Sequence, residues 1–336
     1  MLSFADARDL VAKPMDETSA TAVIDLLMAA ALAVDQGAEL LIRWQRRGPT
    51  GTELAAVVRC LLARAVRPPI TRPVFDLCGT GGSGRVRFNV STTAAFVLAA
   101  AGVPVAKHGN KGSARPNGSF DLLDALGIPY QLPPERLAEV HARTGLCFLF
   151  ARAMHPAVAA VAPYRKAAAA VVPRTIFNLA GPLANPCRPT RQLIGVVDQQ
   201  TAAVVCDAIA ILGTEAALVI RGHPGIDEIS ITGPTQVWAV GIRAPTEYLI
   251  PAARDPDSLP GGDAQENAKL FSDLVAGNGH PDLAGMVAAN AGVAIDLWHG
   301  RTPDIAGPGV TEAARLIAAG AIAAQVDAYK AAALAG

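Results

Sequence analysis

The run Gly79-Thr80-Gly81-Gly82-Ser83-Gly84 follows a short apolar segment and is suited to binding an anion. Because glycine has no side chain, backbone N–H groups in such a turn can approach a diphosphate closely. The turn lacks the Lys-Ser or Lys-Thr ending of a nucleoside-triphosphate loop, and its spacing does not match the dinucleotide fingerprint. Glycines also mark ordinary tight turns, so other residues must identify the ligand.

A second anion-suited element begins five residues after the last glycine, at Asn89-Val90-Ser91-Thr92-Thr93. It starts a predicted helix over residues 91–101, where free N–H groups and the helix dipole attract anions and hydroxyls can meet a cation. Ser91 or Thr92 could equally act as an ordinary helix cap. Two such elements within 14 residues favour phosphate binding.

A third group, Lys107-His108-Gly109-Asn110, ends an apolar segment. We expect the Lys107 side chain to point into a crevice rather than the core and to offer a point charge to phosphate. A strand-end lysine is often merely solvated and a single histidine is often structural. Here both lie beside a glycine and an amide, which favours a ligand-binding role.

The elements that must position these residues alternate between strand and helix. Residues 74–78 and 103–107 read as strands on either side of the glycine turn and the helix at 91–101. This order predicts a parallel α/β sheet with ligands at the carboxyl ends of its strands. Later segments repeat the alternation, with strands at 192–197, 217–221 and 228–231 and a helix at 200–212.

Residues 1–67 show helical periodicity, in 20–34 and 52–66, and predict a small all-helical domain. We expect residues 166–187 or thereabouts to complete it, because prolines there mark crossings between the two parts. Residues 72–165 and 188–336 then form a large α/β domain. Its central sheet is expected to be mainly parallel and flanked by helices.

Composition narrows the class of protein. The 336 residues carry 29 basic and 29 acidic side chains, so no net field draws the chain to nucleic acid or anionic lipid. No apolar run reaches the roughly 20 residues of a membrane span. The start lacks the pattern of a secretory signal, and the five cysteines are scattered, so we expect a cytoplasmic protein with reduced thiols.

Seven blocks between residues 76 and 237 together resemble the anthranilate phosphoribosyltransferase family, in order and over most of the chain. The resemblance implies Mg²⁺-dependent transfer of phosphoribose from 5-phosphoribosyl 1-diphosphate to the amine of anthranilate, a step of tryptophan biosynthesis. It also implies a homodimer formed through the helical domains, with each active site between a small and a large domain. The blocks are DLCGTGGSG, FNVSTT, KHGN, NGSFDLLDALG, MHPAVAAVAPYRK, RTIFNLAGPLANP and IDEISITGPTQV.

The resemblance also implies roles for individual residues. The diphosphate would lie against Gly79, Thr80, Gly81, Gly82 and Ser83. Asn89 would hold the ribose, and Ser91 and Thr92 the diphosphate with its metal, while Lys107 and Ser119 would bind phosphate groups of the same donor.

An Asp-Glu pair alone is normally a solvated turn, but Asp227 and Glu228 fall inside the block IDEISITGPT. Carboxylate oxygens are suitable ligands for Mg²⁺, and substrate phosphates can complete its shell. On the acceptor side the resemblance implies His108, Asn110 and Arg165, and Arg165 could pair with a carboxylate through its fork-shaped guanidinium.

Two departures concern the substrates directly. The family usually has aspartate after GTGG, where this chain has Ser83, so one charge near the diphosphate is missing. The family's arginine and serines after KHGN are replaced by residues 111–117, which include Pro116. Both departures lie where the substrates would bind, and the second borders the acceptor.

Three alternatives stay open. A paralogue could use the same donor with another aromatic amine or a nitrogen heterocycle. A nucleoside phosphorylase of related architecture would not need the acidic pair. A non-catalytic relative that binds nucleic acid would show a basic surface and lose the catalytic blocks, whereas here charge is balanced and Asp227 and Glu228 are present.

Overall fold

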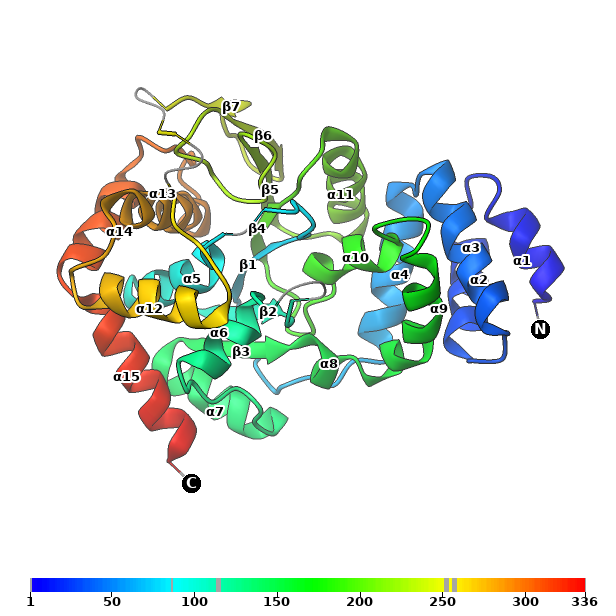
Figure 1. Cartoon of the computed structure of the whole chain (residues 1–336), viewed down its shortest axis with the longest axis horizontal. Helices are drawn as coiled ribbons and strands as arrows, with labels where there is room; N and C mark the ends of the chain where they lie inside the picture. The colour runs from blue at the N-terminus through cyan, green and yellow to red at the C-terminus, as the bar shows by residue number, and fades with distance from the viewer. Residues whose placement is uncertain (1, 86, 113–115, 251–253, 256–258, 336) are drawn as a thin grey trace.

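A computed structural model describes residues 2–85, 87–112, 116–250, 254–255 and 259–335 of the chain. Its centre is a sheet of seven strands in the order β3-β2-β1-β4-β5-β6-β7 within this described part (Figure 1). Strands β1 to β5 run parallel, and β6 and β7 add an antiparallel edge. The predicted mainly parallel sheet is confirmed. The strands are β1 Phe75–Gly79, β2 Val105–Gly109, β3 Leu146–Phe150, β4 Arg191–Gly195, β5 Ala216–Gly222, β6 Thr235–Val240 and β7 Glu247–Tyr248.

The predicted strand at 228–231 is wrong. The backbone of Ile229 bonds to a side chain instead of a neighbouring strand: its N–H donates to Asn290 Oδ1 and its carbonyl accepts from Asn290 Nδ2, both at 2.9 Å. The N–H of Ser230 donates to Thr235 Oγ1, also at 2.9 Å. Side chains thus satisfy this buried backbone, and the apolar residues that suggested a strand belong to a loop.

Helices cover both faces of the sheet and form a separate group around α1 to α4, on the right in Figure 1. The predicted helices at 91–101 and 200–212 correspond to α5 and α11. In the described part of the chain no helix is both long and apolar enough to span a bilayer. The longer helices are α2 Glu17–Met28, α3 Val34–Arg47, α4 Gly51–Ala63, α5 Val90–Ala100, α7 Pro134–Thr144, α11 Gln199–Leu212, α12 Ala264–Val275, α13 Pro281–Trp298, α14 Pro308–Ala318 and α15 Ala321–Leu334. The shorter ones are α1 Phe4–Leu10, α6 Ser119–Ala125, α8 Ala151–Met154, η1 Pro156–Val161, α9 Ala162–Ala168, α10 Ile176–Ala180 and η2 Gly181–Leu183.

The apolar core is divided by the sheet. One face packs against α5 and α13 through residues such as Phe96 and Val287. The other face, including Ile194 and Val219, belongs to the same buried cluster as the N-terminal helices and the segment from Val161 to Ala184. The two-domain division at 67 and 187 stays a prediction, because this apolar cluster joins the helical group directly to the sheet.

The helical group is held together by one buried carboxylate. Glu53 is fully buried, and its Oε1 accepts from Met15 N at 2.8 Å and from Arg47 Nη2 at 2.6 Å. Its Oε2 accepts from Trp44 Nε1 and from Thr50 N, both at 2.9 Å. One side chain therefore satisfies donors from α3, from the start of α4 and from the segment after α1.

We expect Glu53→Gln to lower the free energy of unfolding by about 3 kcal/mol, because it removes the charge that balances Arg47 and replaces an acceptor with a donor. Urea unfolding followed by circular dichroism measures the change. Glu39→Gln is the matched control: Glu39 pairs with Arg43 on an exposed helix surface, and its loss should cost less than about 0.5 kcal/mol. Equal effects of the two substitutions would contradict this role for Glu53.

Candidate active site

The glycine turn follows the carboxyl end of β1, beside the end of β4. Gly79 and Gly195 are register partners, and Thr80 N donates to the Gly195 carbonyl at 2.8 Å. Gly81 and Gly82 have φ of +68° and +84°, values that L side chains rarely adopt. The sequence therefore uses glycine here because the turn must reverse directly above the sheet.

Asp227 is brought to this turn from 146 positions away in the chain: its Oδ2 accepts the Gly81 N–H at 2.9 Å. Two glycines make room for it. A Cβ on Gly79 would lie 2.1 Å from Asp227 Oδ2, and a Cβ on Gly195 would lie 1.8 Å from the Asp227 carbonyl oxygen. The structure thus places the predicted acidic pair against the predicted diphosphate turn.

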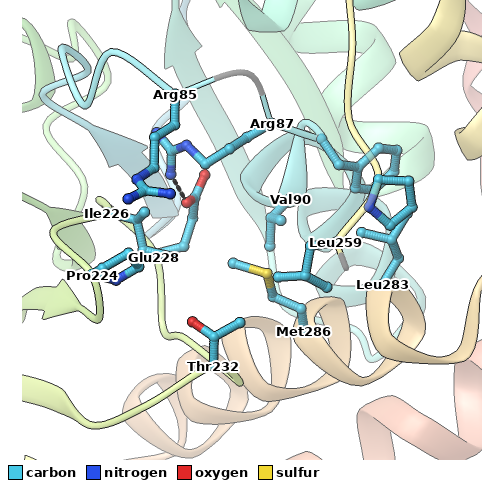
Figure 2. Close-up of a pocket in the computed structure, with 12 residues that line it drawn as sticks. Arg85, Arg87, Val90, Pro224, Ile226, Glu228, Thr232, Leu259, Leu283 and Met286 are labelled. Carbon is cyan, nitrogen blue, oxygen red and sulfur yellow. Dashed lines mark hydrogen bonds and ion pairs between the residues drawn. The ribbon is translucent and has the colours of Figure 1, made fainter. Parts of the chain in front are cut away.

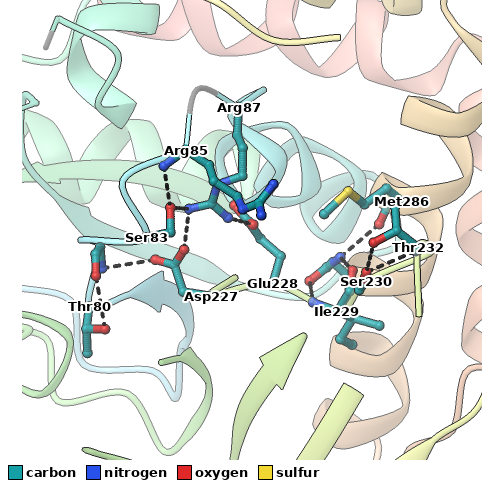
Figure 3. A network of polar contacts seen from close by, with 12 residues as sticks. Thr80, Ser83, Arg85, Arg87, Asp227, Glu228, Ile229, Ser230, Thr232 and Met286 are labelled. Carbon is teal, nitrogen blue, oxygen red and sulfur yellow. Dashed lines mark hydrogen bonds and ion pairs between the residues drawn. The ribbon is translucent and has the colours of Figure 1, made fainter. Parts of the chain in front are cut away.

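Sequence reasoning missed Arg87, whose guanidinium lies between the two carboxylates (Figure 3). Its Nη2 is 2.5 Å from Asp227 Oδ1 and 2.8 Å from Ser83 Oγ, and its Nη1 pairs with Glu228 Oε2. The side chains of Asp227 and Glu228 are only 8% and 13% exposed. Buried carboxylates need a partner of opposite charge, and here Arg87 supplies it.

The pKa values of the two acids shift in opposite directions. Burial raises the pKa of Asp227, but the charge of Arg87 and hydrogen bonds from Arg87 and Gly81 N outweigh it, so the pKa lies below its usual 3.8. Burial raises the pKa of Glu228 to about 7, the charge of Arg87 opposes the rise, and Asp227 adds to it. The pair therefore carries at least one firmly held negative charge beside the turn.

The start of α5 is tied to two distant segments. Asn89 Nδ2 donates to the Asn117 carbonyl, and Asn89 Oδ1 accepts from Asn267 Nδ2, both at 2.9 Å. Asn267 is buried and also donates to the Arg87 carbonyl at 2.9 Å. Asn267 is a second residue that sequence reasoning left without a role.

The two predicted hydroxyls of α5 differ in exposure. Ser91 is half-buried in the first turn, whereas Thr92 is fully buried. Thr92 Oγ1 has no hydrogen-bond partner among the described residues. Neither hydroxyl is placed against Asp227 or Glu228 by a contact in this structure, so their predicted metal and diphosphate roles stay predictions.

Lys107 does not point into an open crevice as expected: it is 1% exposed, and its Nζ donates to the Leu77 carbonyl at 2.6 Å. A parallel sheet covered on both faces buries most of its strand side chains, and Lys107 is one of them. The neighbouring Asp76 is fully buried; burial raises its pKa to about 6, and the charge of Lys107 opposes the rise. The predicted phosphate contact of Lys107 therefore stays a prediction.

Ser119 begins α6 and lies against the end of β2, since a Cβ on Gly109 would be 3.5 Å from Ser119 Oγ. Arg174, the first residue of the block RTIFNLAGPLANP and given no role by the sequence, lies against the glycine turn: a Cβ on Gly82 would be 3.2 Å from Arg174 Cδ. Its Nη1 is buried and has no partner among the described residues, while Nη2 is 3.6 Å from Asp198. Arg174 thus adds a cation near the predicted diphosphate.

Two predicted acceptor residues contact one segment, 176–183. His108 Nδ1 is 3.1 Å from the Gly181 carbonyl, and the Arg165 guanidinium lies 5.9 Å from the centre of the Phe177 ring. Asn110 is exposed, and its Oδ1 accepts from Lys111 N at 2.9 Å. Of the divergent loop at 111–117, residues 113–115 lie outside the described part, so the effect of that loop stays a prediction.

His108 is a neutral imidazole. It is 2% exposed, and burial together with the neighbouring His155 lowers its pKa to about 3. With a proton on Nδ1 donated to Gly181, the buried Nε2 keeps a free lone pair, since Nε2 has no partner among the described residues. His108 can therefore accept a hydrogen bond from a ligand but is unsuited to supplying a proton.

We expect His108 to make the protein acid-sensitive. The unfolded chain binds a proton on this residue near pH 6.5 and the folded chain near pH 3, so stability is complete above pH 6.5 and falls as pH drops. The slope from one such group is about 1.4 kcal/mol per pH unit. In urea unfolding between pH 4 and 8, the free energy of unfolding of His108→Gln should fall less steeply with decreasing pH than that of the wild type. An unchanged slope would show that His108 is protonated in the folded protein.

Comparison with known proteins agrees with this geometry. The glycosyl transferase family, a/b domain, matches residues 71–323. An anthranilate phosphoribosyltransferase from Synechococcus sp. (strain JA-3-3Ab) is 40% identical over 291 residues, which are 84% of this chain and 83% of the relative. The enzyme of that name from Rubrobacter xylanophilus is 38% identical over 312 residues, 91% of this chain and 90% of the relative.

Solved structures agree as well. The anthranilate phosphoribosyltransferase of Thermus thermophilus superposes with a TM-score of 0.87 at 37% identity, covering 98% of this chain and 99% of that one. The Saccharomyces cerevisiae enzyme in complex with PRPP and Mg has a TM-score of 0.83 at 22% identity, covering 100% and 94%. The yeast structure supports the fold. From the sequence matches over most of its length, this chain belongs to the anthranilate phosphoribosyltransferase family.

Proposed function

We propose that this protein transfers 5-phosphoribose from 5-phosphoribosyl 1-diphosphate to the amine of anthranilate, with Mg²⁺, in tryptophan biosynthesis. The observation that carries the proposal is the contact between Asp227 and Gly81 N. This contact brings together two features: an acidic pair suited to a divalent cation and a glycine turn suited to a diphosphate. The donor and metal are those named for the yeast relative.

The residues present fit Mg²⁺. Asp227 and Glu228 offer hard oxygen ligands, and the pair already accommodates a positive charge in the form of the Arg87 guanidinium. The described residues contain no group of three or more acidic, histidine or cysteine side chains suited to a metal, so donor phosphates and the Ser91 hydroxyl would complete the shell. When bound, Mg²⁺ would neutralise the charge that develops on the leaving diphosphate.

The chain's own residues supply position and charge. The turn from Gly79 to Gly82 would lie against the diphosphate, with Arg174 beside it. The N–H groups of Thr80 and Gly81 hold the turn in place through Gly195 and Asp227. His108 would accept a hydrogen bond from the acceptor amine, and Arg165 would pair with the acceptor carboxylate. An aromatic amine needs little deprotonation before it attacks, so alignment of the two substrates is the main contribution.

An acceptor panel tests the proposal. Purified protein is incubated with the donor, Mg²⁺ and separately with anthranilate, other aromatic amines, nitrogen heterocycles and, in a phosphorolysis assay, uridine or thymidine. We expect phosphoribosylanthranilate as the main product, detected by mass spectrometry. Product from another acceptor but none from anthranilate would assign a paralogous reaction instead, and phosphorolysis would assign a nucleoside phosphorylase.

We further propose that the protein acts in the cytoplasm as a homodimer associated through its helical group. The dimer is what the family resemblance implies, and the scattered cysteines suit a reducing compartment. Light scattering coupled to gel filtration measures the mass in solution, and a monomer at micromolar concentration would contradict the dimer.

A further inference from the structure

Arg87 already occupies the place where a divalent cation would bind. One nitrogen of its guanidinium pairs with Asp227 Oδ1 and another pairs with Glu228 Oε2. These oxygens are also the ligands available to a metal ion. A metal ion on these carboxylates would lie beside the guanidinium, so the two cations repel each other and compete for the negative charge of this pair.

The contacts of the guanidinium itself are few. Ser83 Oγ accepts from Nη2 at 2.8 Å, and Nε is buried without a partner among the described residues. By contrast the Arg87 backbone is fixed: its carbonyl accepts from Asn267, and a Cβ on Gly261 would lie 2.6 Å from Arg87 Cα. The guanidinium is therefore held by the two carboxylates and Ser83. The Arg87 backbone cannot move freely.

Space for the displaced side chain adjoins the ion pair. Arg87 and Glu228 line a cavity of about 290 Å³ together with Arg85, Val90, Thr232 and Met286 (Figure 2). The cavity is larger than the volume of several water molecules. A guanidinium that leaves the carboxylates therefore has open space beside it.

We propose that Arg87 is an internal cation that competes with the divalent metal for Asp227 and Glu228, and that Ser83 steadies it in the occupying position. Metal binding then requires the guanidinium to withdraw, which weakens the apparent metal affinity by the fraction of molecules in which the pair is free. The metal requirement rests on the proposed function. The competition itself is a property of the free protein and can be measured without turnover.

Mn²⁺ binding tests this directly. Free Mn²⁺ is counted by electron paramagnetic resonance as it is titrated into wild-type protein and into Arg87→Gln, each with and without inorganic diphosphate. We expect the dissociation constant of Arg87→Gln to be at least about tenfold lower, because no internal cation has to be displaced. Mg²⁺ should also raise the melting temperature of Arg87→Gln more than that of the wild type, since the metal restores a partner to the carboxylates.

Arg85→Gln is the matched control, because it removes an exposed charge of the same kind from the same loop and the same cavity wall. We expect it to change the dissociation constant less than about twofold. Equal gains in Arg85→Gln and Arg87→Gln would overturn the proposal in favour of a general effect of net charge. Unchanged affinity in Arg87→Gln would overturn it as well.

Arg87→Lys covers the case in which Arg87→Gln does not fold. Lysine keeps the charge but not the planar fork, so it is held less rigidly between the two carboxylates. We expect a gain in Mn²⁺ affinity over wild type that is smaller than that of the glutamine variant, and no gain would overturn the proposal. If the Arg87 variants bind Mn²⁺ more tightly but the wild type transfers nothing to anthranilate, the proposed reaction is wrong and the competition for the carboxylates still holds.

Discussion

Replacing Asp227 with asparagine lowers kcat/KM for the sugar diphosphate by about a hundred- to a thousandfold, the range seen when one preorganised charge-stabilising group is removed. Asparagine has the same shape and can still accept the Gly81 N–H, so the turn keeps its form. Its neutral amide cannot serve as a charged metal ligand. It also leaves Arg87 with only Glu228 as a carboxylate partner.

The measurement is steady-state kinetics with the donor varied at saturating Mg²⁺ and anthranilate, with circular dichroism to confirm the fold. Asp273→Asn is the control, because Asp273 pairs with Lys269 on the exposed surface of α12 and should leave kcat/KM unchanged within about twofold. A loss of less than about fivefold in Asp227→Asn would show that this carboxylate does not serve the reaction.

Much of the site could be predicted from the sequence because its parts sit where strands end. Gly79 and Gly195 are register partners at the carboxyl ends of β1 and β4, so the turn that follows β1 and the loops near β4 meet at one edge of the sheet. The mainly parallel sheet followed from the alternation of strands and helices in the same way. The contact of Asp227 with Gly81 joins the turn to the acidic pair, while the roles of the α5 hydroxyls beside them stay predictions.

Arg87 could not be assigned from the sequence. It lies 140 residues from Asp227, and an arginine between a glycine turn and a helix normally faces solvent. Its role depends on a tertiary contact that no local pattern records. One signal was available: Ser83 stands where the family usually has aspartate, and Arg87, four residues later, donates to its hydroxyl.

The misjudged orientation of Lys107 and the wrong strand at 228–231 share a physical origin. Sequence patterns describe a strand by which side chains are apolar, whereas burial on both faces of a parallel sheet depends on the helices that cover it. Lys107 can be buried because its ammonium donates a hydrogen bond to the Leu77 carbonyl. The segment at 228–231 is a loop because Asn290 takes the backbone bonds that a strand neighbour would otherwise make.

Gly195→Ala is expected to have the second large effect, through the backbone of Asp227. A Cβ on Gly195 would lie 1.8 Å from the Asp227 carbonyl oxygen and 2.4 Å from its carbonyl carbon, far inside van der Waals contact. Backbone atoms cannot rotate away as a side chain can, so the Asp227 segment must move. A displacement of about 1 Å at a catalytic site can cost about a hundredfold in rate, and overpacking of this kind costs about 1–3 kcal/mol of stability.

The kinetic assay and urea unfolding used above measure both effects, and Gly285→Ala provides the comparison. Nothing lies within 4 Å of a Cβ on Gly285, which is inside α13, so alanine there should leave activity unchanged and raise stability by about 0.5–1 kcal/mol. If Gly195→Ala retained wild-type kcat/KM and stability, the close approach of Asp227 to the end of β4 could not be part of the working site. If instead it lost activity while Mn²⁺ still bound normally, the damage would lie in the diphosphate turn, because Thr80 N bonds to the Gly195 carbonyl.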